Sequence, residues 1–142
     1  MRLIILLLAA TLTGCASLPP LASVEKDAEA KQFQTESDKA NLYVSRCYWN
    51  PGTALQLSID GRIAGYPRAN AFMLFPVTPG EHDIAVFGSI TGSAAVVQKN
   101  INFEKGRNYF IRLTIGFNGD LNMEQLTEEE GKSTILGLSL YQ

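Results

Sequence analysis

Residues 55–65 read LQLSIDGRIAG, and this stretch decides the fold class. Every second residue from 55 to 59 is apolar, a period of two that is typical of a β-strand with one buried and one wet face. Asp60-Gly61 then supplies the positive φ angles that a tight hairpin turn requires. The stretch therefore predicts two antiparallel strands, over 55–59 and 62–66.

The same pattern of strand-like segments separated by turns extends from residue 41 to the C-terminus. Short segments rich in β-branched and aromatic residues alternate with turns of glycine, proline and asparagine, such as Pro79-Gly80 and Asn118-Gly119. They predict an all-β fold, an immunoglobulin-like antiparallel β-sandwich of about seven to eight strands. The segment 88–93 (GSITGS) is expected to be a mobile loop. The expected strands are 41–47, 55–59, 62–66, 71–77, 81–87, 96–103, 108–117 and 121–126.

Two short helices are expected beside the sandwich. Residues 24–33 are alanine-rich with mixed charges and a narrow apolar side, which predicts a surface helix with Phe33 inserted into the domain. Thr127 and Glu130 have the T-x-x-E spacing of a capping box and predict a C-terminal helical turn.

The N-terminus carries the features of an export signal. Arg2 precedes a mostly apolar stretch over 3–12, which is too short to span a membrane because a spanning helix needs about 20 residues. Leu-Thr-Gly-Cys at 12–15 resembles the lipobox of bacterial lipoproteins. The resemblance implies cleavage before Cys15 and acylation of that residue, and two or three acyl chains hold a protein firmly in a membrane. Ala16 rather than aspartate follows Cys15, which implies the outer membrane.

The chain therefore divides into a signal peptide (1–14), a lipidated tether (15–23) and one β-sandwich domain with an N-terminal helix (24–142). Removing Arg2 with the signal lowers lysine plus arginine from 12 to 11 against 14 acids, a net charge of −3. A near-neutral chain without a basic run does not favour nucleic acid as a partner. Cys47 is then the one remaining thiol, so we expect a small apolar core residue, with an intermolecular bridge as the alternative.

Six segments taken in order resemble one family. The resemblance is to small bacterial lipoproteins known as a domain of unknown function, and the DG hairpin followed by PGEH is similar to PEGA-like β modules. It implies a β-sandwich and maps no catalytic residue onto this chain. The segments are AKQF (30–33), KANLYVSR (39–46), LSIDGRIAG (57–65), FPVTPGEHDI (75–84), KGRNYFIRL (105–113) and EEEGK (128–132).

A candidate binding surface consists of Tyr48, Trp49, Tyr66 and Arg68. Tyrosine and tryptophan beside a turn can stack on a sugar ring or anchor a protein partner. The alternative is that Trp49 closes one end of the sandwich core.

No cofactor, metal or catalytic residue is expected. His82 is the one histidine, so the usual zinc ligand sets cannot form, and no G-x-S-x-G nucleophile motif accompanies it. We expect His82 to be a surface residue near a hairpin. The run EEEGKST lacks the first glycine of a phosphate loop, because Leu126 occupies that position, and the spacing of a calcium loop is also absent.

The sequence thus predicts a lipid-anchored envelope protein, not an enzyme, on the periplasmic face of the outer membrane. We expect a binding or structural accessory module, held in the membrane through Cys15, with an unidentified protein or glycan partner. One alternative is an inhibitor or immunity lipoprotein that neutralises an envelope-targeting enzyme, and another is a hydrolase.

Overall fold

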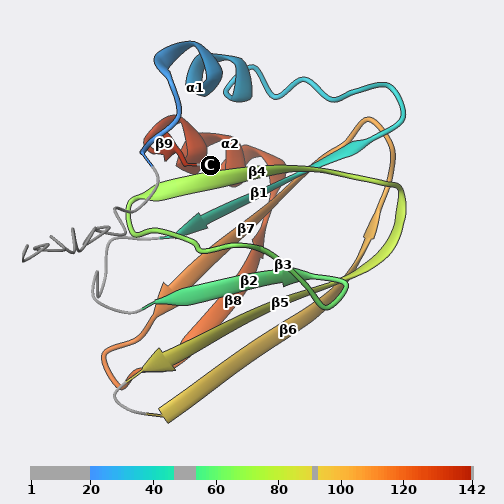
Figure 1. Cartoon of the computed structure of the whole chain (residues 1–142). Helices are drawn as coiled ribbons and strands as arrows, with labels where there is room; N and C mark the ends of the chain where they lie inside the picture. The colour runs from blue at the N-terminus through green and yellow to red at the C-terminus, as the bar shows by residue number, and fades with distance from the viewer. Residues whose placement is uncertain (1–19, 47–53, 91–92, 142) are drawn as a thin grey trace, which may run out of the picture.

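The structure, a computed structural model, describes residues 20–46, 54–90 and 93–141 (Figure 1). Cys15, Cys47, Tyr48 and Trp49 lie outside these ranges. In the described part of the chain, two helices and nine strands follow one another. Their bounds are α1 Val24–Ala30, β1 Ala40–Arg46, β2 Leu55–Ile59, β3 Arg62–Gly65, β4 Ala71–Val77, β5 Gly80–Ile90, β6 Ser93–Phe103, β7 Asn108–Ile115, β8 Leu121–Leu126, α2 Glu128–Leu136 and β9 Ser139–Leu140.

The strands form two stacked sheets, which confirms the all-β sandwich with short helices. One sheet has the order β8-β7-β1-β4-β9 and the other β3-β2-β5-β6. A single hydrophobic core fills the space between them, because the alternating apolar residues of the facing strands meet there. Its fully buried members include Leu42, Val44, Leu55, Leu57, Ile84, Val86, Ile111 and Leu113. The ninth strand is β9, whose two residues are too few to produce a recognisable alternation.

The prediction of a purely antiparallel sandwich is wrong at two pairings. Strand β1 pairs in parallel with β7, with Val44 opposite Ile111, and β4 pairs in parallel with β9. Between β1 and β7 the chain enters the second sheet as β2 and β3, returns to the first sheet as β4, and enters the second sheet again as β5 and β6. Such a long connection permits parallel pairing, and alternation within a strand does not encode its direction.

The turns follow the local sequence closely, with one correction. Asp60 and Gly61 have φ angles of 51° and 73°, which confirms the predicted hairpin turn. The predicted loop 88–93 is wrong at its described residues, because Gly88 pairs with Ala95 and Ile90 with Ser93. The long ladder between β5 and β6 extends into this segment and overrides its low strand propensity.

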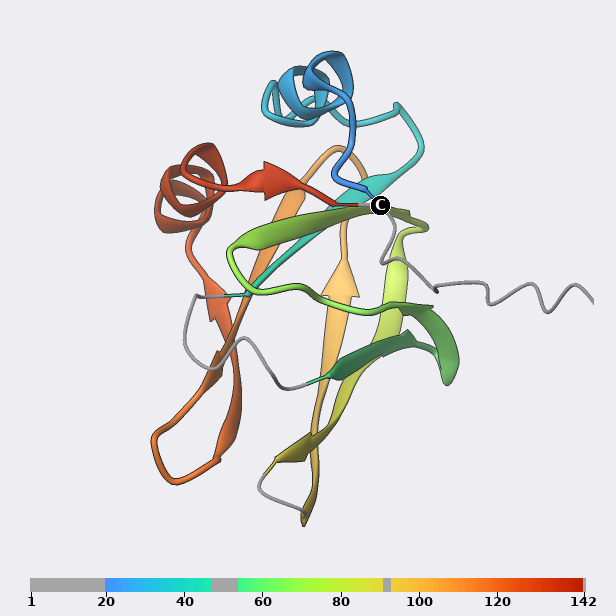
Figure 2. The ribbon, with the colours of Figure 1, turned by 60° about the vertical axis from the view of Figure 1, so that its left-hand side comes forward.

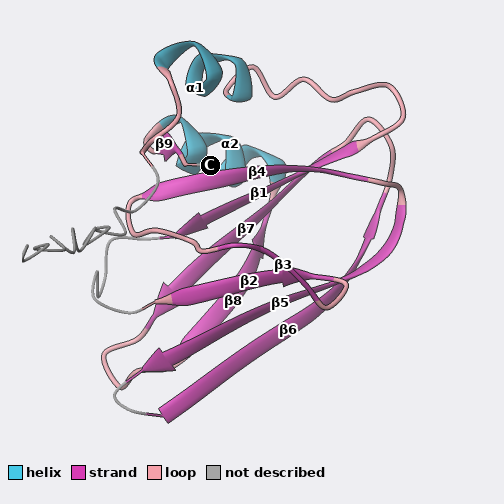
Figure 3. Cartoon of the chain, in the orientation of Figure 1, coloured by secondary structure: helices cyan, strands magenta, loops and turns pink. Residues whose placement is uncertain are grey.

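Both helices lie on the outer face of the five-stranded sheet (Figures 2 and 3). Here β1 and β7 present Tyr43 and Phe110, whose rings stack with centroids 5.0 Å apart. The ring of Phe33 lies 5.5 Å from Tyr43, so its predicted insertion into the domain is confirmed. The Tyr43 hydroxyl donates a hydrogen bond of 2.8 Å to the Ala30 carbonyl at the end of α1. Burial raises the pKa of Tyr43 to about 12, so this donor keeps its proton.

Helix α2 begins with the predicted capping box. The Thr127 hydroxyl accepts from the Glu130 backbone N–H, while the Glu130 carboxylate accepts from the Thr127 N–H at 3.1 Å. The helix is longer than the single turn that was predicted, because Ile135 is buried against the sheet and extends it to Leu136.

The N-terminal residues are attached to the C-terminal strand. Leu21 forms an antiparallel bridge with Tyr141, and the Ala22 N–H donates to the Leu140 carbonyl at 3.0 Å. The Leu140 N–H in turn donates to the Asp27 carboxylate at 2.7 Å. The domain therefore begins at Leu21, inside the predicted tether 15–23.

The ionised Asp27 carboxylate stabilises the attachment of the N-terminal residues to β9. Burial alone raises the pKa of Asp27, but hydrogen bonds from Lys31 and from the Leu140 N–H outweigh it, and the pKa of Asp27 lies below its usual range. The Lys31 ammonium is 2.7 Å from the carboxylate.

Candidate functional site

The outer face of the four-stranded sheet carries an apolar surface. Because Val86 points into the core, its neighbour Phe87 on β5 points outward, and the register places Phe87 between Gln56 on β2 and Val96 on β6. Phe87 and Val96 are 41% and 60% exposed. Ile63 and Tyr66, on and just after β3, are 59% and 54% exposed. Large apolar side chains from three strands are therefore in contact with solvent on this face.

A shallow groove runs over this face, and we call it the sheet-face groove. It has a volume of about 310 Å³. Its lining residues are Ala54, Leu55, Gln56, Tyr66, Phe87, Gly88, Ala94, Ala95 and Val96, none of which is ionisable except the tyrosine.

Ser58 shows how apolar the surroundings of the groove are. The sequence predicts it on a wet face, but Ser58 is only 5% exposed, and its hydroxyl donates to the Ala85 carbonyl at 3.4 Å. Its cross-strand neighbours are Ile63 on β3 and Ala85 on β5. Their position beside the serine accounts for its burial.

The structure separates the members of the predicted binding surface. Tyr66 lines the sheet-face groove, whereas the Arg68 guanidinium lies 5.0 Å from the centre of the Tyr141 ring and does not line it. Tyr48 and Trp49 lie outside the described residues, as does the lipidation residue Cys15.

Buried Arg46 positions the segment that carries Tyr66 and Arg68. The Arg46 guanidinium Nη1 donates to the Pro67 carbonyl at 3.0 Å, and the Asn70 N–H donates to the Arg46 carbonyl at 3.0 Å. The connection between β3 and β4 is thereby held against the end of β1.

Sequence reasoning missed Ile63, Phe87 and Val96. A signal was present in the doublets Val86-Phe87 and Val96-Val97, which break the alternation of apolar and polar residues. In a strand, one member of such a doublet must face outward.

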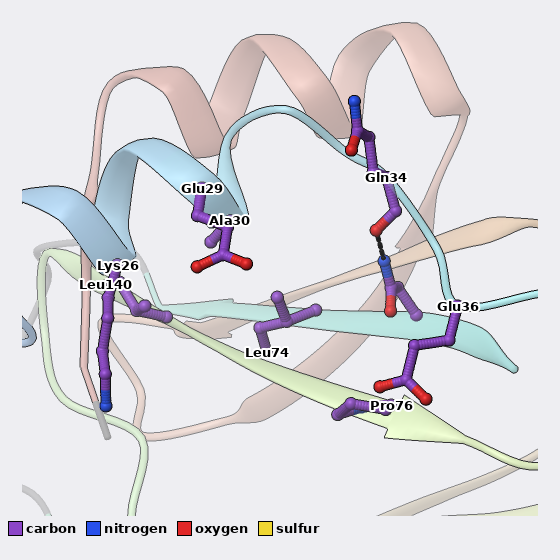
Figure 4. A pocket seen from close by; sticks show the side chains of 9 residues that line it. Lys26, Glu29, Ala30, Gln34, Glu36, Leu74, Pro76 and Leu140 are labelled. Carbon is purple, nitrogen blue, oxygen red and sulfur yellow. Dashed lines mark hydrogen bonds between the residues drawn. The ribbon is translucent and has the colours of Figure 1, made fainter.

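A second groove lies between α1 and β4 and has a volume of about 290 Å³ (Figure 4). Lys26, Glu29 and Glu36 stand around it, and Figure 4 shows the two carboxylates over an apolar floor. The Asn41 amide, which also lines it, donates to the Gln34 carbonyl at 2.8 Å and so holds the loop that follows α1. The floor consists of Ala30, Leu74, Pro76 and Leu140.

His82 is less exposed than the sequence predicts, because it belongs to a polar cluster. Its Nδ1 lies 2.6 Å from the Asp60 carboxylate, and its Nε2 lies 2.9 Å from the Thr78 carbonyl and 3.3 Å from the Thr78 hydroxyl. Its ring packs edge-on against Phe103 at 5.7 Å. The side chain is 16% exposed.

These contacts tie two turns together. An ionised carboxylate and a carbonyl oxygen only accept hydrogen bonds, so a hydrogen bond to either of them requires the His82 ring nitrogen to donate. A nitrogen that donates to the Thr78 carbonyl cannot at the same time take a proton from the Thr78 hydroxyl. The cluster therefore fits a structural clamp between the β2–β3 turn and the start of β5 better than a nucleophile–base pair. The metal-binding residue types do not gather in groups of three or more anywhere in the described ranges.

A measurement of the Asp60 pKa tests whether His82 and Asp60 form this structural clamp. The hydrogen bond from His82 and one from the Asp83 N–H hold the pKa of Asp60 below its usual value of about 3.9. Because the folded pKa is lowered, the stabilisation is present above the ordinary value and is lost as the pH falls through the folded value. We expect a carbon-detected NMR titration to give a midpoint for Asp60 below about 3.9, and His82→Gln to raise it. A midpoint that His82→Gln leaves unchanged would contradict the clamp.

No family model matches the sequence. A protein of Haemophilus influenzae, described as an uncharacterized protein, is 37% identical to this chain over 135 residues. The match covers 91% of this chain and 77% of the Haemophilus protein. Among the described helices, none is long and apolar enough to cross a membrane.

Proposed function

This chain belongs to the same family as the Haemophilus influenzae protein, and from that premise we propose that it is a lipid-anchored protein of the bacterial cell envelope. In this proposal Cys15 carries the acyl chains, and the β-sandwich faces the periplasm from the outer membrane. The domain acts by binding and has no catalytic role.

The observation that carries the proposal is the order of features at the N-terminus. A charged residue, a short apolar stretch and Leu-Thr-Gly-Cys at 12–15 follow one another within fifteen residues. The folded domain begins with Leu21, only six residues after Cys15. This spacing leaves a short segment between a membrane anchor and the sandwich.

A binding role is supported by the sheet-face groove. Soluble domains rarely leave several large apolar side chains from neighbouring strands exposed together, and such surfaces commonly mark sites of interaction. Tyr66 and Phe87 at the groove are of the residue types that dominate interface energetics.

Metabolic labelling of the two cysteine variants tests the proposal. In a Gram-negative host grown with labelled palmitate, we expect the unmodified protein and Cys47→Ser to take up label. Cys15→Ser is expected to take up none, because serine offers no thiol for the thioether, and to keep its signal peptide. Label in Cys15→Ser would contradict the proposal, and Cys47→Ser controls for acylation at the other thiol.

The proposed outer-membrane location has its own measurement. Separation of inner and outer membranes on a density gradient is expected to place the protein with the outer membrane. We expect Ala16→Asp to shift it toward the inner membrane, because aspartate after the lipidated cysteine is the retention signal that the resemblance implies. An unlipidated protein in the soluble periplasmic fraction would contradict both statements.

A further inference from the structure

The N-terminal chain joins the sandwich at its β9 edge, beside β3. Leu21 pairs with Tyr141, which packs in one cluster with Met73 of β4. The tip of Met73 lies directly against Gly65 of β3, where an added Cβ would be 2.3 Å from the methionine Cε. Strand β3 is an edge strand of the four-stranded sheet, and β9 is an edge strand of the five-stranded sheet. Tyr66 at the sheet-face groove follows Gly65 directly.

The length of chain before Leu21 limits how far the domain can stand from a lipid at Cys15. Six residues span at most about 20 Å when fully extended. A four-stranded sheet is about 14 Å wide between its outer strands. A lipid at Cys15 therefore lies within about 20 Å of Leu21, at the β9 edge of the sandwich, which β3 borders in the second sheet.

The chemistry of that face suits a lipid interface. Ile63, Phe87 and Val96 are apolar and exposed, and Tyr66 has the apolar body and polar tip that are typical of residues at membrane–water boundaries. The Arg68 guanidinium, two residues after Tyr66, lies 5.0 Å from the centre of the ring of Tyr141, the residue that pairs with Leu21.

The opposite side of the domain has the charge of a surface that faces away from a membrane. The first turns of α1 and α2 together carry five acidic residues, of which two are paired with lysines, Asp27 with Lys31 and Glu128 with Lys132. Anionic lipids repel such a surface. The acidic residues are Glu25, Asp27, Glu128, Glu129 and Glu130.

We infer that the outer face of the β3-β2-β5-β6 sheet rests on the membrane, with the sheet-face groove at the lipid interface and the helices turned toward the periplasm. The inference rests on the proposed lipid anchor and adds to it the orientation of the domain. The lipid anchor supplies most of the affinity, and the sheet face sets which side the domain presents.

Photolabelling from the bilayer tests the orientation. The lipidated full-length protein is reconstituted in vesicles of phosphatidylethanolamine and phosphatidylglycerol that contain a phospholipid with a photoactivatable acyl chain. Mass spectrometry is expected to find about fivefold more label on peptides covering 62–68 and 85–98 than on those covering 24–33 and 128–136, because only buried apolar surface approaches the acyl region.

Two double variants, one on the sheet face and a control on the helices, test the orientation further. Phe87→Ser/Val96→Ser is expected to lower the label on the sheet face about fivefold, because it removes apolar area from the interface. Val24→Ser/Leu136→Ser changes two exposed apolar residues on the helices, 81% and 59% exposed, and is expected to leave the labelling unchanged. Thermal unfolding verifies that each variant is folded. If Phe87→Ser/Val96→Ser is not folded, Ile63→Ser on the edge strand β3 replaces it as the sheet-face variant.

The position of the label determines whether the proposed orientation is correct. Label spread evenly or concentrated on the helices overturns the orientation. An unlabelled sheet face together with crosslinked pairs of chains also overturns it, because a second copy then covers the groove. Palmitate on Cys15 is measured in the same preparation, so an unlipidated protein disproves the proposed function, whereas a lipidated protein with label elsewhere disproves the orientation alone.

Discussion

Gly131→Ala is expected to destabilise the domain by about 3 kcal/mol, a large value for the addition of one methyl group. Gly131 lies in α2 directly against the ring of Phe110, and an added Cβ would be 2.1 Å from the ring Cγ. Phe110 is 2% exposed and is held by its stacking on Tyr43, so it has little room to move. The helix or the ring must shift, and the contacts between α2 and the sheet are lost with it.

Whether Gly131→Ala lowers or raises the stability of the domain distinguishes the effect of tight packing from the effect of helix propensity. At an exposed helical position, glycine to alanine stabilises a helix by about 1 kcal/mol. Gly137→Ala at the end of the same helix is the matched control. Gly137 has an α-helical φ of −85°, and an added Cβ would lie 3.6 Å from the Thr134 carbonyl oxygen, an ordinary van der Waals contact.

Chemical denaturation of the two variants provides the measurement. We expect a lower midpoint for Gly131→Ala and an unchanged or slightly higher midpoint for Gly137→Ala. Combining Gly131→Ala with Phe110→Leu is expected to cost less than the sum of the two single changes, because the smaller side chain relieves the overlap. Equal stability of Gly131→Ala and the parent protein would disprove the close contact.

Leu57→Ala is expected to cost about 2–5 kcal/mol, the range for truncating a buried leucine in a core. Leu57 lies in the middle of β2 with no exposed surface and faces the core between the sheets. Its removal leaves a cavity that the close-packed neighbours fill only in part, and the loss of stability grows with the volume left empty.

Ile63→Ala is the matched control for Leu57→Ala. The two substitutions remove the same number of carbon atoms from the two strands of one hairpin. Because Ile63 is 59% exposed on the outer face, its truncation is expected to cost about 1 kcal/mol or less. Similar losses for both variants in urea denaturation would mean that the two faces of the sheet are wrongly assigned.

These two predictions differ in how far the sequence alone leads to them. The inward position of Leu57 follows from the alternation along β2 and from the Asp60-Gly61 turn, both of which are local patterns. The contact between Gly131 and Phe110 joins residues 21 positions apart, on a helix and on a strand. No local pattern in the sequence indicates it.

The candidate site shows the same division. The sequence predicts Tyr66 as a candidate surface residue because it is an aromatic residue beside a hairpin, whereas it indicates no special role for the strand residues Phe87 and Val96. Their exposure depends on the register of β2, β5 and β6, which places them side by side on the outer face. The pairing of His82 with Asp60 likewise depends on two turns that meet only in the folded chain.

The sequence by itself determined the all-β class, most strand positions and the Asp60-Gly61 and Thr127–Glu130 motifs, because each depends on residues that are close together along the chain. Tertiary structure decided the parallel pairing of β1 with β7, the attachment of Leu21 to Tyr141 and the gathering of apolar side chains at the sheet-face groove. Each of these joins distant segments, and such contacts are selected by the packing of the whole core.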